Sequence, residues 1–382
     1  MSKSILIIGG TGVLSAAVVD CCVVQGHDVT MINRGNNEAY INPAAKVILC
    51  DARNSQLVKQ KIAHLHFDVV LDFIVFTKEQ LEQSLAIFGY IADQYIFISS
   101  AQVYNTSVQK IFEENDETPQ PLWSYSSDKD ICEKYLRAYC REHQINYTII
   151  RPGVNYDNRR IPYGMYPPMG MHYTIIARIL AGKPIITWNN GLNKLNLTRV
   201  EDFAAGLVGL LGNPKAYNET FNVVGDFVYT WQQVLDVLEK ILNVPVLTVD
   251  IPLNLYANEL KVSDREMLLG GRACDLVCSN KKLKSIVHDF NPSIELEQGI
   301  RMTLDWYKEN NYYRGFDYKW DAEQDRIIKE LAGIDVGYKS YSSNRDIHRL
   351  YDFCVYKSHY YRNNSVKGLF YKIVHKIIKS IV

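Results

Sequence analysis

The sequence predicts an α/β protein built on a doubly wound parallel sheet, with a second, smaller α/β domain and a helical C-terminal extension. Short apolar segments with strand character alternate with helical segments over roughly the first 150 residues, which is the pattern of βαβ units. Several strand segments are apolar throughout, which indicates a sheet covered by helices on both faces. A glycine-rich turn joins the first strand to the first helix.

Composition indicates the size of the core and excludes some classes of partner. A chain of 382 residues with 47% hydrophobic residues supports two or three domains. Its 42 Lys and Arg balance its 42 Asp and Glu, so the chain lacks the overall basic charge of a nucleic-acid-binding protein, and we expect no nucleic-acid partner. The eight cysteines lack the paired spacing of metal ligands, so we expect no metal, reduced thiols and a cytoplasmic protein.

The first strand and helix flank a turn that suits a phosphate group. The apolar run over 5–8 predicts the strand, and the helix is predicted over 13–24. Between them, Gly9, Gly10 and Gly12 allow a sharp turn and a close approach of the backbone to a ligand. The N-terminus of the helix would stabilise a phosphate. The alternative is an ordinary connection, because a single glycine turn is a weak motif.

The remaining elements are predicted from apolar runs, helical spacing and strand-breaking prolines. Further strands of the first domain are expected over 28–32, 46–49, 68–72, 94–99 and 146–150, with helices over 54–64, 78–88 and 124–142. In the second half, helices are expected over 173–181, 200–211, 231–242 and 294–307, with strands over 185–187, 220–223 and 246–249.

Two polar residues follow the second and third strands, where a dinucleotide would contact the sheet. At the position of Arg34, an acidic residue favours a free ribose 2′-hydroxyl and an arginine accommodates a 2′-phosphate, so Arg34 favours NADP over NAD. A solvated turn arginine is the alternative. Asp51 can accept a hydrogen bond from the adenine amino group, and helix capping is its alternative. The expected cofactor is therefore NADP or NAD.

Ser100, Tyr125 and Lys129 form a candidate acid–base site. Tyr125 and Lys129 are four residues apart in a helical segment and therefore share one face. A phenol that exchanges a proton at neutral pH needs a lowered pKa, and a lysine ammonium one turn away stabilises the phenolate. Ser100, at the end of the fifth strand, would orient the same substrate oxygen. A Tyr-x-x-x-Lys pair alone is usually a surface pair, but together with the serine and the glycine turn it predicts catalysis.

These motifs resemble the extended short-chain dehydrogenase/reductases of the NAD-dependent epimerase/dehydratase type, over residues 2–307. The resemblance implies a Rossmann domain, hydride transfer to NAD or NADP, and a nucleotide-sugar substrate. It implies that Ser100 orients the substrate hydroxyl, Tyr125 is the acid/base and Lys129 contacts the ribose. It assigns cofactor contacts to Gly9, Thr11, Gly12, Val13, Leu14, Arg34, Asp51, Ala52, Phe73, Lys129, Pro152 and Val154, and substrate contacts to Ala101, Gln102, Asn155, Arg199 and Arg272.

The chain departs from the family pattern at a few positions. Ser15 stands where the family has the third glycine of the turn. Lys194 and Leu195 stand where sugar epimerases have an arginine that holds the diphosphate, and only Arg265 or Arg272 lies near the second arginine of that pattern. The catalytic residues are therefore present, whereas the diphosphate contacts differ.

The resemblance also divides the chain and suggests a function. Residues 1–156, with 194–225 returning to them, form the predicted dinucleotide-binding domain; residues 157–310 form mainly the substrate-binding domain. Residues 157–171 are expected to close over a ligand or to form a surface connection. We expect an enzyme that modifies a nucleotide-activated sugar for surface polysaccharide synthesis, and a homodimer formed through 124–142. The alternatives are a lipid-linked sugar substrate and a non-catalytic NAD(P)-fold protein that binds RNA or regulates.

Residues 311–382 form a basic, tyrosine-rich extension that ends in an amphipathic helix over 366–382. One stripe of this helix is apolar and the other face carries lysines. The stripe either packs on its own domain or a sister subunit, or lies on an anionic membrane, at the inner face. The apolar positions are Val366, Leu369, Phe370, Ile373, Val374, Ile377, Ile378, Ile381 and Val382.

Overall fold

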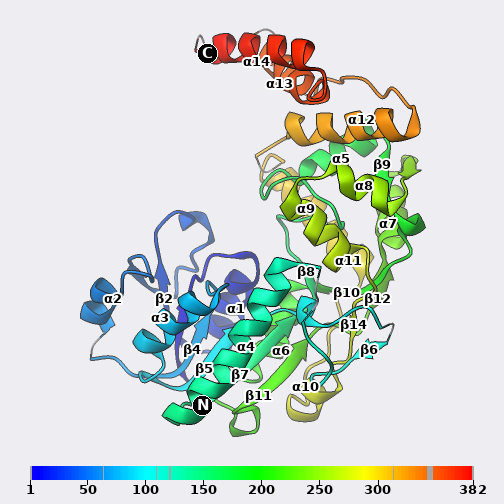
Figure 1. The fold of residues 1–382 in the computed structure, drawn as a ribbon. Coiled ribbons are helices and arrows are strands. Elements are labelled where there is room, and N and C mark those ends of the chain that lie inside the picture. Colours follow the sequence, from blue (N-terminus) through cyan, green and yellow to red (C-terminus); the bar gives the residue numbers. More distant parts are fainter. Residues whose placement is uncertain are drawn as a thin grey trace. The chain divides into compact units, whose positions relative to one another are not determined.

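The computed structural model describes residues 2–62, 64–108, 110–119, 122–312, 314–341 and 347–380 (Figure 1). The chain forms two compact units, and each is described by itself. Unit 1 comprises Met1–Asp157, Lys194–Tyr229 and Leu269–Glu295. Unit 2 comprises Asn158–Asn193, Thr230–Leu268 and Leu296–Val382.

Unit 1 is organised around a seven-stranded sheet in the order β11-β7-β5-β4-β1-β2-β3. All of its strand pairs are parallel, which confirms the predicted doubly wound sheet. The strand order reverses between β1 and β4, and sheets of this kind bind ligands at the carboxyl ends of the strands beside that point. The strands are β1 (Ser4–Ile8), β2 (Asp28–Asn33), β3 (Lys46–Leu49), β4 (Phe67–Asp72), β5 (Ala92–Ile98), β7 (Tyr147–Pro152) and β11 (Glu219–Val223).

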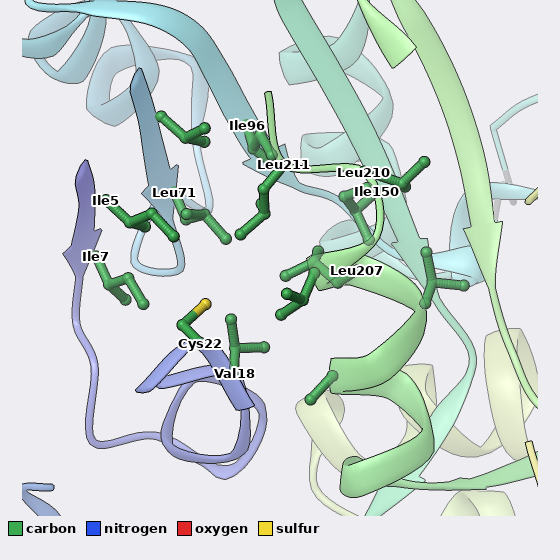
Figure 2. Close-up of a cluster of buried hydrophobic side chains, with 14 of the residues drawn as sticks. Ile5, Ile7, Val18, Cys22, Leu71, Ile96, Ile150, Leu207, Leu210 and Leu211 are labelled. Carbon is green, nitrogen blue, oxygen red and sulfur yellow. The ribbon is translucent and has the colours of Figure 1, made fainter. Parts of the chain in front are cut away.

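Successive residues of β1 contribute to hydrophobic cores on opposite faces of the sheet. Ile5 and Ile7 pack with residues of α1 and α6 (Figure 2), whereas Leu6 and Ile8 pack with residues of α2, α3 and α4. All four side chains are fully buried, which explains the uninterrupted apolar segment. The covering helices are α1 (Val13–Val24), α6 (Val200–Val208), α2 (Ser55–Ile62), α3 (Lys78–Phe88) and α4 (Ser124–His143).

Several short elements beside the large sheet, unlike β9 (Ile185–Thr187) and β13 (Thr248–Asp250), were not predicted. β10 (Lys194–Arg199) pairs in parallel with β8 (Val154–Tyr156), and it alternates buried Leu195 and Leu197 with polar residues. Strands this short are hard to predict from the local sequence, because the strands they pair with are distant in the chain. The others are β6 (Ile111–Phe112), β12 (Val228–Thr230), β14 (Val277–Cys278) and α10 (Lys281–Ile286).

Unit 2 packs around an aromatic core. The Tyr163 ring lies 6.0 Å, centroid to centroid, from the rings of both Trp188 and Trp231, and all three side chains are buried. Ile161 is buried as well. The expectation of a surface connection over 157–171 is therefore wrong, because this segment supplies core side chains. Helices α5 (Tyr173–Leu180), α7 (Trp231–Leu242), α8 (Leu253–Glu259), α9 (Val262–Met267) and α11 (Leu296–Glu309), with strands β9 (Ile185–Thr187) and β13 (Thr248–Asp250), form this part.

Three further helices form the C-terminal region of unit 2: α12 (Tyr318–Ala332), α13 (Ile347–Tyr360) and α14 (Ser365–Lys379). The helical C-terminal extension is thus confirmed, although only its last helix was located from the sequence. Asp317 caps α12 by accepting hydrogen bonds from the backbone of Lys319 and Trp320. Ile381 and Val382 lie outside the described residues. Within the described part of the chain, every helix is too short or too polar to cross a membrane.

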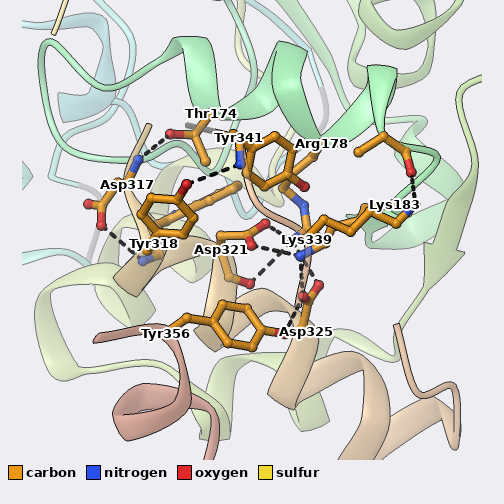
Figure 3. Close-up of polar contacts among 12 residues, drawn as sticks. Thr174, Arg178, Lys183, Asp317, Tyr318, Asp321, Asp325, Lys339, Tyr341 and Tyr356 are labelled. Atoms are coloured by element: carbon orange, nitrogen blue, oxygen red, sulfur yellow. Dashed lines mark hydrogen bonds and ion pairs between the residues drawn. The ribbon is translucent and has the colours of Figure 1, made fainter. Parts of the chain in front are cut away.

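A buried ionic cluster joins α12 to α5, to Lys183 just beyond it, and to α13 (Figure 3). Arg178 and Lys183 each donate to both Asp321 and Asp325, and all four side chains are fully buried. The Tyr356 hydroxyl donates to the Asp325 carboxylate over 2.7 Å. Two carboxylates therefore balance two cations, as burial of charge requires.

Candidate active site

The glycine turn has the geometry that close contact with a ligand requires. Gly9 has a φ of +83°, and a Cβ there would lie 2.4 Å from Cγ2 of Ile74. Ser15, which replaces the family's third glycine, donates through its hydroxyl to the carbonyl of Gly9 and accepts from the amide of Gly12. The Ser15 hydroxyl therefore links the two ends of the turn by hydrogen bonds, so a serine at this position stabilises the turn.

A cavity of about 270 Å³ opens at this turn, at the carboxyl ends of β1, β2 and β3. Six of the predicted cofactor contacts, from the glycine turn and the strand ends, line it together: Gly9, Thr11, Gly12, Arg34, Asp51 and Ala52. The tight turn, the helix N-terminus and this cavity fit a dinucleotide whose phosphates lie against the turn.

The cavity carries a second guanidinium that the sequence reasoning missed. Arg53 lines it beside Arg34, and both side chains are exposed. The Asp51 carboxylate accepts from the backbone N–H of Arg53 over 3.0 Å, whereas Asn54 accepts from Leu57 at the start of α2. Asp51 therefore shapes the turn that carries Arg53, and Asn54 is the helix cap.

The other predicted cofactor contacts lie outside the lining of this cavity. Val13 and Leu14 form the first turn of α1. Phe73 packs against the core on the α1 side, and its neighbour Ile74 lines the cavity instead. Pro152 is the last residue of β7, and Val154 is the first of β8.

Tyr125 and Lys129 lie on one face of α4. Tyr125 is in the first turn, where its ring centroid lies 5.0 Å from that of Trp123 and 6.5 Å from that of Phe76. The Lys129 Nζ lies 6.0 Å from the Tyr125 ring centroid and 4.6 Å from that of Phe76. Tyr125 is half-buried, with aromatic rings beside it and the Lys129 ammonium one helical turn away.

Lys129 is held at the carboxyl ends of the strands. Its ammonium donates to the carbonyls of Val75 (2.6 Å) and Ile98 (2.7 Å). The side chain is buried, and this burial lowers the pKa of the ammonium to about 8, against the opposing effect of nearby carboxyl groups such as Asp72. The Lys129 ammonium is therefore protonated at neutral pH and loses its proton as the pH rises through about 8.

The two serines after β5 differ in their contacts. Ser99 donates to Glu133 of α4 over 2.6 Å, whereas the Ser100 hydroxyl caps the short 3₁₀ helix Ala101–Val103 by accepting from Gln102 N. Glu133 also forms a two-point ion pair with buried Arg151 of β7. This buried pair fixes α4, and with it Tyr125, to the sheet. Glu133 is one turn beyond Lys129, and that spacing could have revealed it.

A π-helical turn, Leu268–Arg272, brings a distant segment to the start of α4. A Cβ at Gly271 would lie 2.8 Å from the Trp123 ring and 2.9 Å from Oε1 of Gln102. A Cβ at Gly270 would lie 2.6 Å from Cβ of Trp123. Only glycines permit this close approach to Trp123 and Gln102, and the predicted substrate residue Arg272 directly follows Gly271 in the chain. Sequence reasoning missed Trp123 and both glycines.

The remaining predicted substrate contacts have partners within unit 1. Ala101 is buried in a small hydrophobic cluster. The Asn155 amide donates to the carbonyl of Gly153. Arg199 is fully buried and donates twice to Glu201. Two of the Arg199 donors are therefore already used inside the protein.

Comparisons with known proteins agree with this architecture. Residues 5–224, more than half of the chain, match the profile of the NAD dependent epimerase/dehydratase family. A chloroplast stem-loop binding protein of 41 kDa from Arabidopsis thaliana is 29% identical over 243 residues, which are 60% of each protein. A putative UDP-glucose 4-epimerase of Methanocaldococcus jannaschii is 24% identical over 80% of this chain and 99% of its own.

Solved structures show the same fold. The UDP-glucuronic acid 4-epimerase of Bacillus cereus, in complex with UDP-glucuronic acid and NAD, superimposes with a TM-score of 0.62 and 21% identity, over 80% of this chain and 99% of its own. The parallel sheet, the glycine turn before α1 and the profile match over 5–224 lead to one assignment. The chain belongs to the NAD-dependent epimerase/dehydratase family.

Proposed function

We propose that this protein is an NAD(P)-dependent enzyme that modifies a nucleotide-activated sugar, with Tyr125 as its acid/base. The proposal is carried by the pairing of Tyr125 and Lys129 on α4, in the same unit as the cavity at the glycine turn. A tyrosine beside a buried ammonium is suited to removing a proton from an alcohol at neutral pH. Ser100, with its hydroxyl at the end of β5, is the proposed orienting group.

Proton transfer at one hydroxyl is the proposed role of these side chains. As phenolate, Tyr125 takes the O–H proton while the carbon loses its hydride, and it returns the proton when the carbonyl is reduced again. The Lys129 ammonium stabilises the phenolate, and the Ser100 hydroxyl orients the substrate oxygen. A bound nicotinamide dinucleotide supplies hydride acceptance and return. Epimerase, reductase and dehydratase chemistry all begin with this oxidation or its reverse.

A panel of nucleotide sugars tests this function. Each sugar is incubated with the protein and with NAD or NADP, the absorbance of reduced nicotinamide is followed, and products are identified by NMR. We expect one sugar class to give a new sugar or transiently reduced cofactor. A protein that binds cofactor but changes no nucleotide sugar of the panel would contradict the proposal.

We propose NADP as the preferred cofactor. Arg34 and Arg53 both line the cavity at the end of β2, and β2 itself ends in Asn33 instead of an acidic residue. Charge-assisted hydrogen bonds of this kind contribute about 1.5–3 kcal/mol each. Arg34→Ala and Arg53→Ala are therefore expected to lower kcat/KM for NADP by roughly 10- to 100-fold. NAD is the matched control, and equal losses with both cofactors would reject the preference.

A loss of activity at alkaline pH is expected from Lys129. Its pKa is lowered to about 8, so the ammonium is present below that pH and is lost as the pH rises through it. The phenolate then loses its neighbouring charge, and log kcat/KM should fall with a slope of about −1 above pH 8. A pH profile of wild type and Lys129→Arg measures this. A wild-type profile that stays flat to roughly pH 10 would contradict the role.

A second candidate is a non-catalytic RNA-binding protein on the same fold. The similarity to the Arabidopsis stem-loop binding protein favours it, although the balanced charge of this chain does not. RNA retention in a gel-shift assay, with no turnover of any sugar, would support this alternative. For the enzyme, we propose a cytoplasmic location, in keeping with its eight free cysteines. We also propose that it is a homodimer and that it serves surface polysaccharide synthesis.

A further inference from the structure

We infer that the outer face of α14 binds the surface of an anionic membrane. Five apolar side chains of this helix are exposed to between 50% and 77%, and we call them the apolar row. Their spacing of three and four residues places them along one side of the helix. The row consists of Val366, Leu369, Phe370, Ile373 and Ile377.

Packing within unit 2 uses the opposite side of α14. A Cβ at Gly368 would lie 2.7 Å from the carbonyl of Tyr361, so α14 approaches the end of α13 closely there. The Tyr371 ring stacks on Tyr361 at 6.1 Å, and Ile378 is buried. The expectation that the stripe packs on its own domain therefore holds for Ile378 but is wrong for the apolar row.

The charges beside the apolar row favour an anionic partner. Lys372, Lys376 and Lys379 are exposed on α14 and form no ion pair with the described residues. Residues 353–382 contain six Lys and Arg and no Asp or Glu. An apolar row with a cationic flank matches a bilayer of anionic lipids. The apolar side chains would be buried among the acyl chains, and the ammonium groups would pair with the headgroups.

The same charges argue against pairing of two copies through this face. A two-fold interface brings identical patches together, so the lysines that flank one row would meet those of the other copy. Such like charges repel, and no carboxylate on α14 offsets them. A protein surface without negative charge would leave the lysines unpaired as well.

The helical hairpin of α13 and α14 presents its outer face in a defined position within unit 2. The Tyr356 hydroxyl donates to buried Asp325, and the Tyr360 hydroxyl donates to Asp335 over 2.9 Å. These bonds hold α13 against α12 and the chain that follows it, and α14 packs on α13. The apolar row is therefore already exposed in the folded chain, so binding needs little ordering of the helix.

Vesicle co-sedimentation of the full chain tests the inference. Vesicles of phosphatidylcholine with phosphatidylglycerol are compared with phosphatidylcholine alone, at low and high salt. We expect partition into the anionic vesicles that weakens at high salt. The triple variant Lys372→Gln/Lys376→Gln/Lys379→Gln should lose roughly 100-fold in partition, at about fivefold per lysine. Leu369→Gln/Ile373→Gln should lose about tenfold or more.

Matched controls separate membrane binding from misfolding and from general charge. Lys261→Gln/Lys308→Gln removes two exposed lysines elsewhere in unit 2 and should partition like wild type. Circular dichroism melts of all variants should coincide, because every substituted side chain is exposed. The readout is lipid binding, so it is independent of the nucleotide-sugar proposal.

Three results would overturn the inference. One is equal partition into neutral and anionic vesicles. Another is wild-type partition of the Leu369→Gln/Ile373→Gln variant, as for a simple polyanion contact such as RNA. The third is a dimer in lipid-free analytical ultracentrifugation that dissociates in this variant, because that would assign the apolar row to a second copy of the chain.

Discussion

Tyr125→Phe is expected to lower kcat by about 10²–10⁴-fold, the usual contribution of a positioned acid/base. The substitution removes only the phenolic oxygen, and the ring contacts with Trp123 and Phe76 can persist. Cofactor affinity should therefore remain close to wild type, because the cavity at the glycine turn is lined by other residues. Steady-state kinetics and a cofactor titration measure the two effects.

Tyr135→Phe is the matched control for this prediction. Tyr135 lies on the same helix, ten residues further on, and its ring contacts Lys78 and Tyr139 instead of the candidate site. Its variant should retain near-wild-type kcat. Unchanged turnover in Tyr125→Phe, or an equal loss in both variants, would remove Tyr125 from the proposed acid/base role.

Asp325→Ala is expected to lower the free energy of unfolding by about 3–5 kcal/mol, the cost of removing one partner from a buried ionic cluster. Arg178 and Lys183 would then share the single carboxylate of Asp321 inside a fully buried site. The Tyr356 hydroxyl would also lose its acceptor, which loosens α13. Thermal denaturation should show the change as a drop of the order of 10 °C in Tm.

Glu323→Ala on the same helix separates burial from charge. Glu323 is partly exposed and lies 3.5 Å from both His359 and Arg362. Pairs of this kind contribute about 0–1 kcal/mol, so its loss should shift Tm by only a few degrees. If the two variants had the same Tm, the buried ionic cluster would not be what stabilises the C-terminal helices.

Local sequence patterns were sufficient where an arrangement of side chains or backbone depends on residues that are close together in the chain. Gly9 to Gly12 follow an apolar strand, and the four-residue spacing of Tyr125 and Lys129 defines a helix face by itself. The structure keeps both arrangements, and it brings the turn together with Arg34 and Asp51 around one cavity. Carboxyl ends of parallel strands share an edge, so this meeting follows from the strand order.

Contacts between distant segments were not predictable. Trp123 lies beside Gly270 and Gly271, almost 150 residues later, and no local periodicity indicates that a Cβ would not fit there. Arg53 was overlooked because it reads as a residue of a helix start, and only the turn at Asp51 places it at the cavity. In α12, Asp321 and Asp325 are spaced like charged residues of a solvent-exposed helix face. Only their distant partners, Arg178 and Lys183, show that both are buried.

The sequence by itself determined the fold class, the glycine turn and the Tyr125–Lys129 face, because these depend on apolar runs and on spacing within one element. Only the tertiary structure decided which side chains are buried. It placed Asp321 and Asp325 with Arg178 and Lys183 in the interior, and it left the apolar row of α14 exposed. An amphipathic pattern states that a face is apolar, but burial depends on the surfaces that other segments bring to it.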